Sequence, residues 1–489
     1  MQSRTNYGSG VLLHPTALPG LGGIGDIGPE AYRFIDDLHE MGQNFWQILP
    51  IGPVDKYGSP YSSTSTFAGN EFLISFDLLV EDGLLNSSYL AKIINGNDSM
   101  SLSDILRYKL LILRKVSENF DKNSSSDLDN RFSQFCIDQS YWLDDYAMYY
   151  SLKELNNNKS WINWDTDIHT SKINVRYVKI IQFIFHDQWR RLHKYCKSKK
   201  ITIIGDMPIY VGYDSADVYS NKELFQLNAS GEMKYKSGCP PCEYQENGQV
   251  WGNPLYEWEE HEKSEFIWWE NRFNKLLEMV DLIRLDHFIG YHRYYRIPVK
   301  DETAKNGEWI KSPGDKLFSK MTPLINKENI ISEDLGNVTK GVTNLRDKYK
   351  YPGMRVLQFD LEHIPNIDND SNNSVVYTGT HDNDTIMGWF STLPELDSNP
   401  EILTKEKLLN FFKCSSAELS WKVIDYAMSS GSDICIIPIQ DILLLDSSSR
   451  FNTPGTLSVN NWAWRMDKQL DCDTKSRLME ITKKNNRKI

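Results

Sequence analysis

Four acidic side chains follow four short apolar runs, each near the C-terminal end of its run. They are Asp206 after Ile203-Ile204-Gly205, Asp286 after Ile283-Arg284-Leu285, Glu333 after Ile330-Ile331-Ser332, and Asp382 after Val375-Val376-Tyr377-Thr378-Gly379-Thr380-His381. Any one of them has a structural explanation, such as capping a helix or loop, or pairing with Arg284 on one face of a strand. Four like charges brought to one axis would repel one another, so chemistry explains them better. Clustered carboxyls can act as a general acid, a general base or a nucleophile.

The elements that carry these acids are short β-branched runs that alternate with longer segments of helical period. This alternation is typical of a parallel sheet covered by helices. Eight candidate strands are Gly10–His14, Phe45–Ile51, Ile201–Ile209, Val280–Phe288, Asn329–Asp334, Met354–Asp360, Ser374–Thr380 and Asp433–Ile439. Because the loops after the strands of an α/β barrel form its active site, the acids are placed correctly for a barrel enzyme. We therefore expect the α/β class and a (β/α)8 TIM barrel, one catalytic domain over residues 1–489.

The uneven spacing of the candidate strands indicates inserted, largely helical subdomains. The largest insertion, residues 53–171, separates the second and third strands and shows helical patterning. A second, residues 211–262, separates the third and fourth strands and is rich in Gly, Pro and aromatic residues. We expect this second insertion to include an aromatic lid loop.

Composition excludes several classes of partner. With 54 basic and 66 acidic residues the net charge is −12, which disfavours nucleic acid and anionic membranes. No apolar run approaches the ~18 residues of a membrane span, and the N-terminus lacks a signal-peptide pattern, so we expect a cytoplasmic protein. The seven cysteines suggest no disulfide framework. Cys239-Pro-Pro-Cys242 is a lone pair without a second half for zinc, and we interpret it as two loop thiols.

No P-loop, dinucleotide fingerprint or H-E-x-x-H motif is present, so the acids themselves must indicate the chemistry. Acids beside histidine could hold a divalent metal, which keeps a metal-dependent barrel hydrolase as an alternative. The 14 Trp and 25 Tyr, many of them in predicted loops, favour another interpretation. Sugar rings stack on aromatic side chains, and carboxylates bind sugar hydroxyls. Aromatic loops beside clustered acids therefore indicate a carbohydrate substrate.

Motifs along nearly the whole chain resemble those of one family. They are Gly10-Val-Leu-Leu-His-Pro-Thr-Ala-Leu-Pro19, Trp46-Gln-Ile-Leu-Pro-Ile-Gly-Pro53, Ser59-Pro-Tyr-Ser-Ser-Thr-Ser-Thr-Phe-Ala-Gly-Asn70, Gly205-Asp-Met-Pro-Ile-Tyr-Val211, Gly248-Gln-Val-Trp-Gly-Asn-Pro-Leu-Tyr256, Arg284-Leu-Asp-His-Phe288, Ser332-Glu-Asp-Leu-Gly336 and Thr378-Gly-Thr-His-Asp-Asn-Asp-Thr385. In this order they resemble the 4-alpha-glucanotransferases, the amylomaltase or disproportionating-enzyme family of glycoside hydrolases, related to the α-amylase clan.

The resemblance implies transfer of α-1,4-glucan segments between maltooligosaccharides by a retaining double displacement with a covalent glycosyl-enzyme. It implies that Asp286 is the nucleophile, Glu333 the general acid/base and Asp382 the acid that stabilises the transition state. The substrate contacts it implies are Ser59, Tyr61, Asp206, Trp251, Asn253, Arg284, His381 and Asn452. It implies donor and acceptor glucans as partners, with no cofactor and no metal. An α-1,4-glucan hydrolase of the amylase clan and an inactive glucan-binding protein are the alternatives.

The mechanism sets expectations for two pKa values. Asp286 must be ionised to attack, and Arg284 is expected to keep it so. Glu333 must start protonated, and crowding by Asp286 and Asp382 is expected to raise its pKa.

Two segments depart from the family pattern. Where the family has Pro-Pro-Asp, an aromatic residue or Ala, and Phe, this chain has Pro240-Pro241-Cys242-Glu243-Tyr244-Gln245. Where the family has His-Phe-Arg, it has His287-Phe288-Ile289. We expect the first to alter acceptor choice or the ratio of transfer to hydrolysis, and both to bear on specificity and efficiency, while neither removes a catalytic carboxyl.

Overall fold

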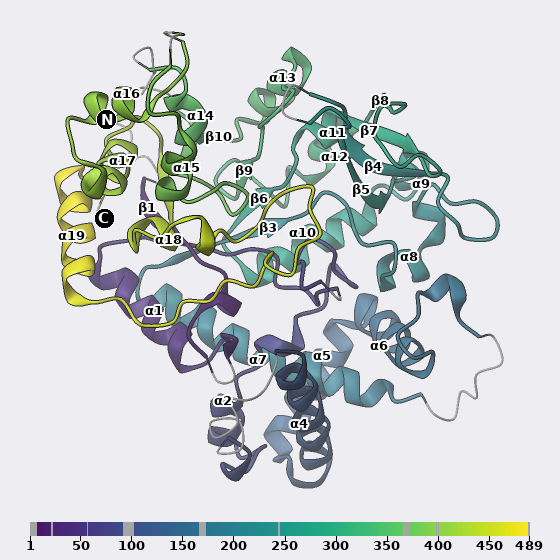
Figure 1. The fold of residues 1–489 in the computed structure, drawn as a ribbon. Helices are drawn as coiled ribbons and strands as arrows, with labels where there is room; N and C mark the ends of the chain where they lie inside the picture. Colours follow the sequence, from purple (N-terminus) through teal and green to yellow (C-terminus); the bar gives the residue numbers. More distant parts are fainter. Residues whose placement is uncertain are drawn as a thin grey trace.

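Eight parallel strands close into a barrel at the centre of the molecule. The computed structural model describes residues 7–20, 23–55, 57–90, 102–165, 173–242, 245–364, 372–397, 399 and 401–487. The strands are β1 (Gly8–Leu12), β2 (Phe45–Gln47), β3 (Thr202–Met207), β6 (Leu282–Leu285), β9 (Ile330–Ser332), β10 (Gly353–Val356), β11 (Ser374–Tyr377) and β12 (Ile434–Pro438). They pair in the order β1-β12-β11-β10-β9-β6-β3-β2 and close the ring (Figure 1). Each overlaps one predicted run, so the predicted (β/α)8 barrel is confirmed.

The barrel strands are buried almost throughout, as expected for parallel strands covered by helices. Two polar side chains of the barrel strands pair with each other: the Tyr377 hydroxyl donates to Gln47 Oε1 at 2.8 Å. Pro438 is the last residue of β12, and a proline at a strand end leaves the interior of the ladder intact.

Helices surround the barrel, and the sequence accounts for their ends. α1 (Pro29–Glu40) starts with proline at its first position, and Gly42 past its end has φ 71°. α7 (Val175–Ser198) is capped by the Asn174 side chain, which accepts from Tyr177 N. The other barrel-side helices are α10 (Ile267–Met279), α11 (Ile289–His292), α12 (Gly314–Met321), α13 (Lys340–Tyr349), α14 (Leu357–Leu361), α15 (Ile386–Thr392), α16 (Lys405–Phe412), α17 (Leu419–Met428), α18 (Ile439–Ile442) and α19 (Cys472–Lys484). Of the helices in the described ranges, none has the length and apolarity to cross a membrane.

The C-terminal end of the described chain is tied to the bottom of the barrel. Arg487 is fully buried and donates to the carbonyl oxygens of Gly8, Met428, Ser430 and Ser432. One guanidinium thus joins the segment after α19 to the start of β1 and to the loop before β12.

A group of helices lies between β2 and β3 and projects to one side, at the bottom of Figure 1. It comprises α2 (Phe76–Glu81), α4 (Leu102–Asn123), α5 (Ser126–Asp138) and α6 (Ser140–Leu155). Its aromatic contacts with α7 include Phe120, Phe132 and Phe183, whose ring centroids lie 5.4–6.0 Å apart. These helices occupy the segment 53–171, and its role as a separate subdomain stays a prediction.

A second, antiparallel sheet lies beside the barrel, at the upper right of Figure 1. Its order is β5-β4-β7-β8, with β4 (Tyr235–Cys239), β5 (Gln249–Pro254), β7 (Arg293–Pro298) and β8 (Glu308–Lys311). The sequence pattern predicted none of these strands, because they are only partly buried and do not form continuous apolar runs. The segment 211–262 contributes β4 and β5, and the lid residues Glu243 and Tyr244 lie outside the described residues.

Candidate active site

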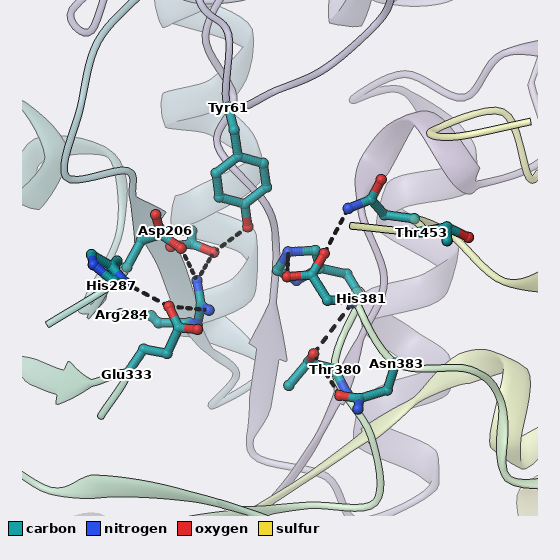
Figure 2. Close-up of polar contacts among 12 residues, drawn as sticks. Tyr61, Asp206, Arg284, His287, Glu333, Thr380, His381, Asn383 and Thr453 are labelled. Carbon is teal, nitrogen blue, oxygen red and sulfur yellow. Dashed lines mark hydrogen bonds and ion pairs between the residues drawn. The ribbon is translucent and has the colours of Figure 1, made fainter. Parts of the chain in front are cut away.

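A single buried guanidinium binds three of the four acids. Arg284 lies in β6 opposite Asp206 of β3 in the strand register. Its Nη1 lies 2.6 Å from Asp206 Oδ2 and 3.2 Å from Asp286 Oδ1, and its Nη2 lies 2.8 Å from Glu333 Oε2. Figure 2 shows the Arg284 side chain between Asp206 and Glu333. Arg284 is 1% exposed, so it compensates charges that little water reaches.

The three acids that contact Arg284 differ in the solvent exposure of their side chains. The Asp206 side chain is completely buried, whereas 23% of Asp286 and 20% of Glu333 is exposed. Asp206 also accepts a hydrogen bond of 2.7 Å from the Tyr61 hydroxyl. Burial raises the pKa of Asp206 even though Arg284 opposes the shift. Asp206 therefore lies beneath the site, and Asp286 and Glu333 face outward.

The pKa values of Asp286 and Glu333 shift in opposite directions. Burial, followed by the neighbouring Glu333, raises the pKa of Asp286 well above its ordinary value. Burial also acts on Glu333, but Arg284 and the N–H of His287 outweigh it, so the pKa of Glu333 is lowered. We expected Arg284 to keep Asp286 ionised and crowding to raise the pKa of Glu333, and both directions are wrong for the unliganded site. The reason is that Glu333, rather than Asp286, has the closer contact with Arg284 and accepts the hydrogen bond from the His287 N–H. Two acids this close titrate as a pair, and the contacts of Arg284 and the His287 N–H favour the ionised form of Glu333.

Asp382 is held from the opposite side of the barrel mouth. Its Oδ1 accepts a hydrogen bond of 2.6 Å from Asn452 Nδ2, and its Oδ2 lies 3.4 Å from His381 Nε2. The Asn452 backbone N–H donates to the His381 carbonyl at 3.1 Å. With 39% of its side chain exposed, Asp382 is more open than Asp286 or Glu333.

An open cleft of about 840 Å³ lies above these groups at the C-terminal ends of the strands. Eight predicted site residues line it: Tyr61, Trp251, Asn253, Asp286, Glu333, His381, Asp382 and Asn452. Asp206 and Arg284 are buried and do not line the cleft. Ser59 lies elsewhere, in an adjoining recess of about 170 Å³. The structure thus brings all three predicted catalytic acids to one cleft.

Aromatic rings line the cleft on both sides. The Tyr61 ring stacks on His381 with centroids 5.2 Å apart and planes at 17°. Trp251 of β5 is 36% exposed and meets the His287 ring edge to face at 4.9 Å. The cleft therefore offers flat apolar surfaces close to its carboxyls.

Sequence reasoning missed three residues of this site. Trp462 lines the cleft, and its ring centroid lies 5.7 Å from that of Tyr61. The sequence signal that could have found it is its place in the same segment as Asn452, ten residues further on. Arg450 donates to the Asp382 carbonyl at 2.5 Å and to the Asn452 carbonyl at 2.7 Å. His287 has a left-handed backbone, φ 46°, and donates its N–H to Glu333. No sequence pattern reveals this conformation, since only a few per cent of non-glycine residues adopt it, although histidine is enriched among them.

Comparison with known proteins agrees with this geometry. The sequence model of the 4-alpha-glucanotransferases matches residues 13–471. The chain belongs to the 4-alpha-glucanotransferase family. A 4-alpha-glucanotransferase of Synechocystis sp. is 40% identical over 479 residues, 94% of this chain and 93% of that protein. One of Clostridium butyricum is also 40% identical, over 93% of this chain and 95% of the relative.

Solved 4-alpha-glucanotransferase structures share the fold. Amylomaltase from Streptococcus agalactiae, determined in complex with acarbose, aligns with a TM-score of 0.91 at 34% identity, covering 99% of this chain and 100% of that one. Amylomaltase from Corynebacterium glutamicum aligns with a TM-score of 0.77 at 18% identity, covering 98% of this chain and 74% of the other. At that identity the second match shows the fold alone. The family, and with it the enzyme class expected from the motifs, is confirmed.

Proposed function

We propose that this protein transfers α-1,4-glucan segments from a donor maltooligosaccharide to the 4-hydroxyl of an acceptor glucan. One observation carries the proposal: Asp286, Glu333 and Asp382, delivered by three different barrel strands, line a single aromatic cleft in a chain of this family. The roles of these acids and the path of the proton are part of the proposal.

In the first step Asp286 attacks the anomeric carbon, and the bond to the glycosidic oxygen breaks. Glu333 gives its proton to the departing oxygen, which leaves as the hydroxyl of the released chain. The product is a covalent glucosyl ester on Asp286, and Glu333 becomes a carboxylate.

This step needs the proton on Glu333, whereas in the unliganded site the pKa of Asp286 is raised and that of Glu333 is lowered. Donor binding therefore has to move one proton across the pair. A glycosidic oxygen placed against Glu333 favours the protonated form, because that form can donate a hydrogen bond to it. Arg284 contacts both carboxyls and stabilises whichever of them is ionised.

In the second step the 4-hydroxyl of the acceptor attacks the ester, and Glu333 accepts its proton. The Asp286 carboxylate leaves, and the new α-1,4 bond has the configuration of the old one. Asp382 and His381 bind hydroxyls of the reacting sugar, and contacts that strengthen as the ring distorts accelerate both steps. Asn452 keeps Asp382 in place for this.

Transfer rather than hydrolysis requires an acceptor sugar to reach the ester before water does. Tyr61, Trp251 and Trp462 give an acceptor chain apolar surfaces on which to bind. Such binding raises the local acceptor concentration and excludes water from the ester. Action in the cytoplasm stays a prediction.

Incubation of the purified protein with maltotriose tests the proposal. We expect glucose together with a ladder of maltooligosaccharides longer than the substrate. Glucose and maltose without longer products would indicate the hydrolase, and unchanged maltotriose would indicate a binding protein. A parallel incubation with EDTA is expected to give the same ladder, and loss of activity there would favour metal-dependent chemistry. In the described part of the chain, no group of three or more His, Cys, Asp or Glu is arranged to hold a metal ion.

A further inference from the structure

We propose that His287 is a positioning residue for Glu333, acting through its left-handed backbone rather than through its ring nitrogens. The inference rests on the proposed function, since it assumes that Glu333 is the acid/base.

The chain between β6 and α11 is bonded to Glu333 at three points. Glu333 N–H donates to the Leu285 carbonyl at 3.0 Å, and Phe288 N–H donates to the Glu333 carbonyl at 2.9 Å. Between these, His287 N–H donates to the Glu333 side chain, at 2.7 Å from Oε2 (Figure 2). The backbone of Glu333 and its carboxyl are therefore both held by four consecutive residues.

The third bond depends on an uncommon backbone conformation. His287 has φ 46° and Phe288 φ −55°, so a left-handed residue precedes a right-handed one. Successive residues of alternating hand turn their N–H groups toward one side, where they can bind an anionic oxygen. Positive φ is uncommon outside Gly, although Asn, Asp and His adopt it more often than other residues, and a β-branched side chain is disfavoured there.

The His287 ring packs in a way that maintains this conformation. On one side it meets Trp251 edge to face, with centroids 4.9 Å apart. On the other it lies close to Gly290, where a Cβ would stand 3.2 Å from His287 Cδ2 and 2.4 Å from Ile209 Cδ1. Gly290 thus leaves space for the ring, and Trp251 covers it. Burial lowers the pKa of His287, so the ring is neutral when the enzyme works near neutral pH.

The N–H of His287 has two effects on Glu333. First, it shares Oε2 with Arg284 Nη2, so two donors fix the orientation of the carboxyl. Second, it stabilises the ionised form, which is the base required in the transfer step. The ionisable groups that act on Glu333 are Arg284, Asp286, the His287 imidazole and, across the barrel, Tyr377 of β11. The imidazole is lost equally from both variants compared below and the other groups stay in place, so a difference between the variants reports the backbone.

The test compares His287→Gly with His287→Val by the pH dependence of kcat for maltotriose disproportionation, which reports ionisations in the substrate complex, where the proposed mechanism has the proton on Glu333. Both variants lose the ring, but Gly keeps positive φ freely and Val opposes it. We expect the basic limb, which reports the protonated Glu333, to move up by about one pH unit in His287→Val, since losing the donor raises the pKa of Glu333. In His287→Gly we expect the limb to stay within about 0.3 unit of the wild type, since a hydrogen bond that persists leaves the Glu333 pKa unchanged.

Equal shifts in both variants, or no shift in either, would overturn the proposal and leave the ring as simple packing. If His287→Val does not fold by circular dichroism, His287→Ala takes its place, with a smaller shift expected in the same direction. Failure of the wild-type protein to elongate maltotriose would count against the proposed function instead.

Discussion

The side chain of Asn452 donates a 2.6 Å hydrogen bond to the carboxylate of Asp382, across 70 residues of sequence. Arg450 reinforces this contact by bonding to the carbonyls of both residues. The segment after α18 thus supports the acid that follows β11, although it contributes no barrel strand. Asn452, expected from the family motifs as a substrate contact, lines the cleft and also positions Asp382.

Replacing Asn452 is therefore expected to reduce activity through Asp382. Asn452→Ala should lower kcat for maltotriose disproportionation by about 10- to 100-fold, because a hydrogen bond to a charged group contributes ~1.5–3 kcal/mol. The control is Asn460→Ala, in the exposed part of the same segment, which should keep wild-type kcat. Equal effects of the two variants would mean that the segment matters only as a whole.

The acid pair itself should be indispensable. Glu333→Gln keeps the shape of the side chain but can neither give nor accept the proton, so kcat should fall by about 10²–10⁴-fold. Asp286→Asn should prevent formation of the ester and show no glucosyl-enzyme by mass spectrometry of denatured protein. The neighbouring Asp334 binds Arg346 and Met354 N instead, so Asp334→Asn should reduce thermal stability more than kcat. Normal turnover in Glu333→Gln would show that the roles are assigned wrongly.

Arg284 is expected to support stability as well as catalysis. Arg284→Ala leaves Asp206 buried without its cation, and breaking a buried ion pair in this way costs about 3–5 kcal/mol of unfolding free energy. Urea denaturation measures the loss. In the double variant Arg284→Ala with Asp206→Asn the fully buried charge of Asp206 is also removed, so part of the stability should return, although Glu333 still lacks its cation. A double variant less stable than the sum of the single ones would contradict this explanation.

The stability of the protein should also depend on Glu71, outside the active site. Burial raises the pKa of Glu71 from 4.5 to about 7, so the folded state binds the proton more tightly than the unfolded state. Its stabilising contribution is complete below about pH 4.5 and is lost as pH rises through about 7.

Glu71→Gln has no titrating group at this position. The wild type loses stability over this range and the variant does not. The difference in unfolding free energy, Glu71→Gln minus wild type, should therefore rise by about 1–3 kcal/mol from pH 5 to pH 8. Urea melts at the two pH values measure this difference. Parallel pH dependence in the two proteins would show that Glu71 is hydrated in the folded state.

The local pattern of the sequence was sufficient to predict the barrel and to identify the acids of its active site. Each barrel strand is a short apolar run, buried on both faces, so that burial of apolar surface determines it wherever the run occurs. The acids stand at the ends of these runs, and parallel strands bring their C-terminal ends to one side of the barrel. Asp286, Glu333 and Asp382 could therefore be predicted together from the sequence, and the family motifs added Trp251, His381 and Asn452.

Other features depend on contacts between distant segments. β4, β5, β7 and β8 are stabilised by pairing with one another, and their own residues show no clear alternation. Burial acts on both acids of the pair, but the pKa of Glu333 is lowered because Arg284 and the His287 N–H both bind it, and these contacts decide between the two acids. That choice depends on differences of a few tenths of an ångström between side chains on separate strands and on one left-handed residue. Electrostatic energies change steeply over such distances in a buried site, so only the tertiary structure could decide them.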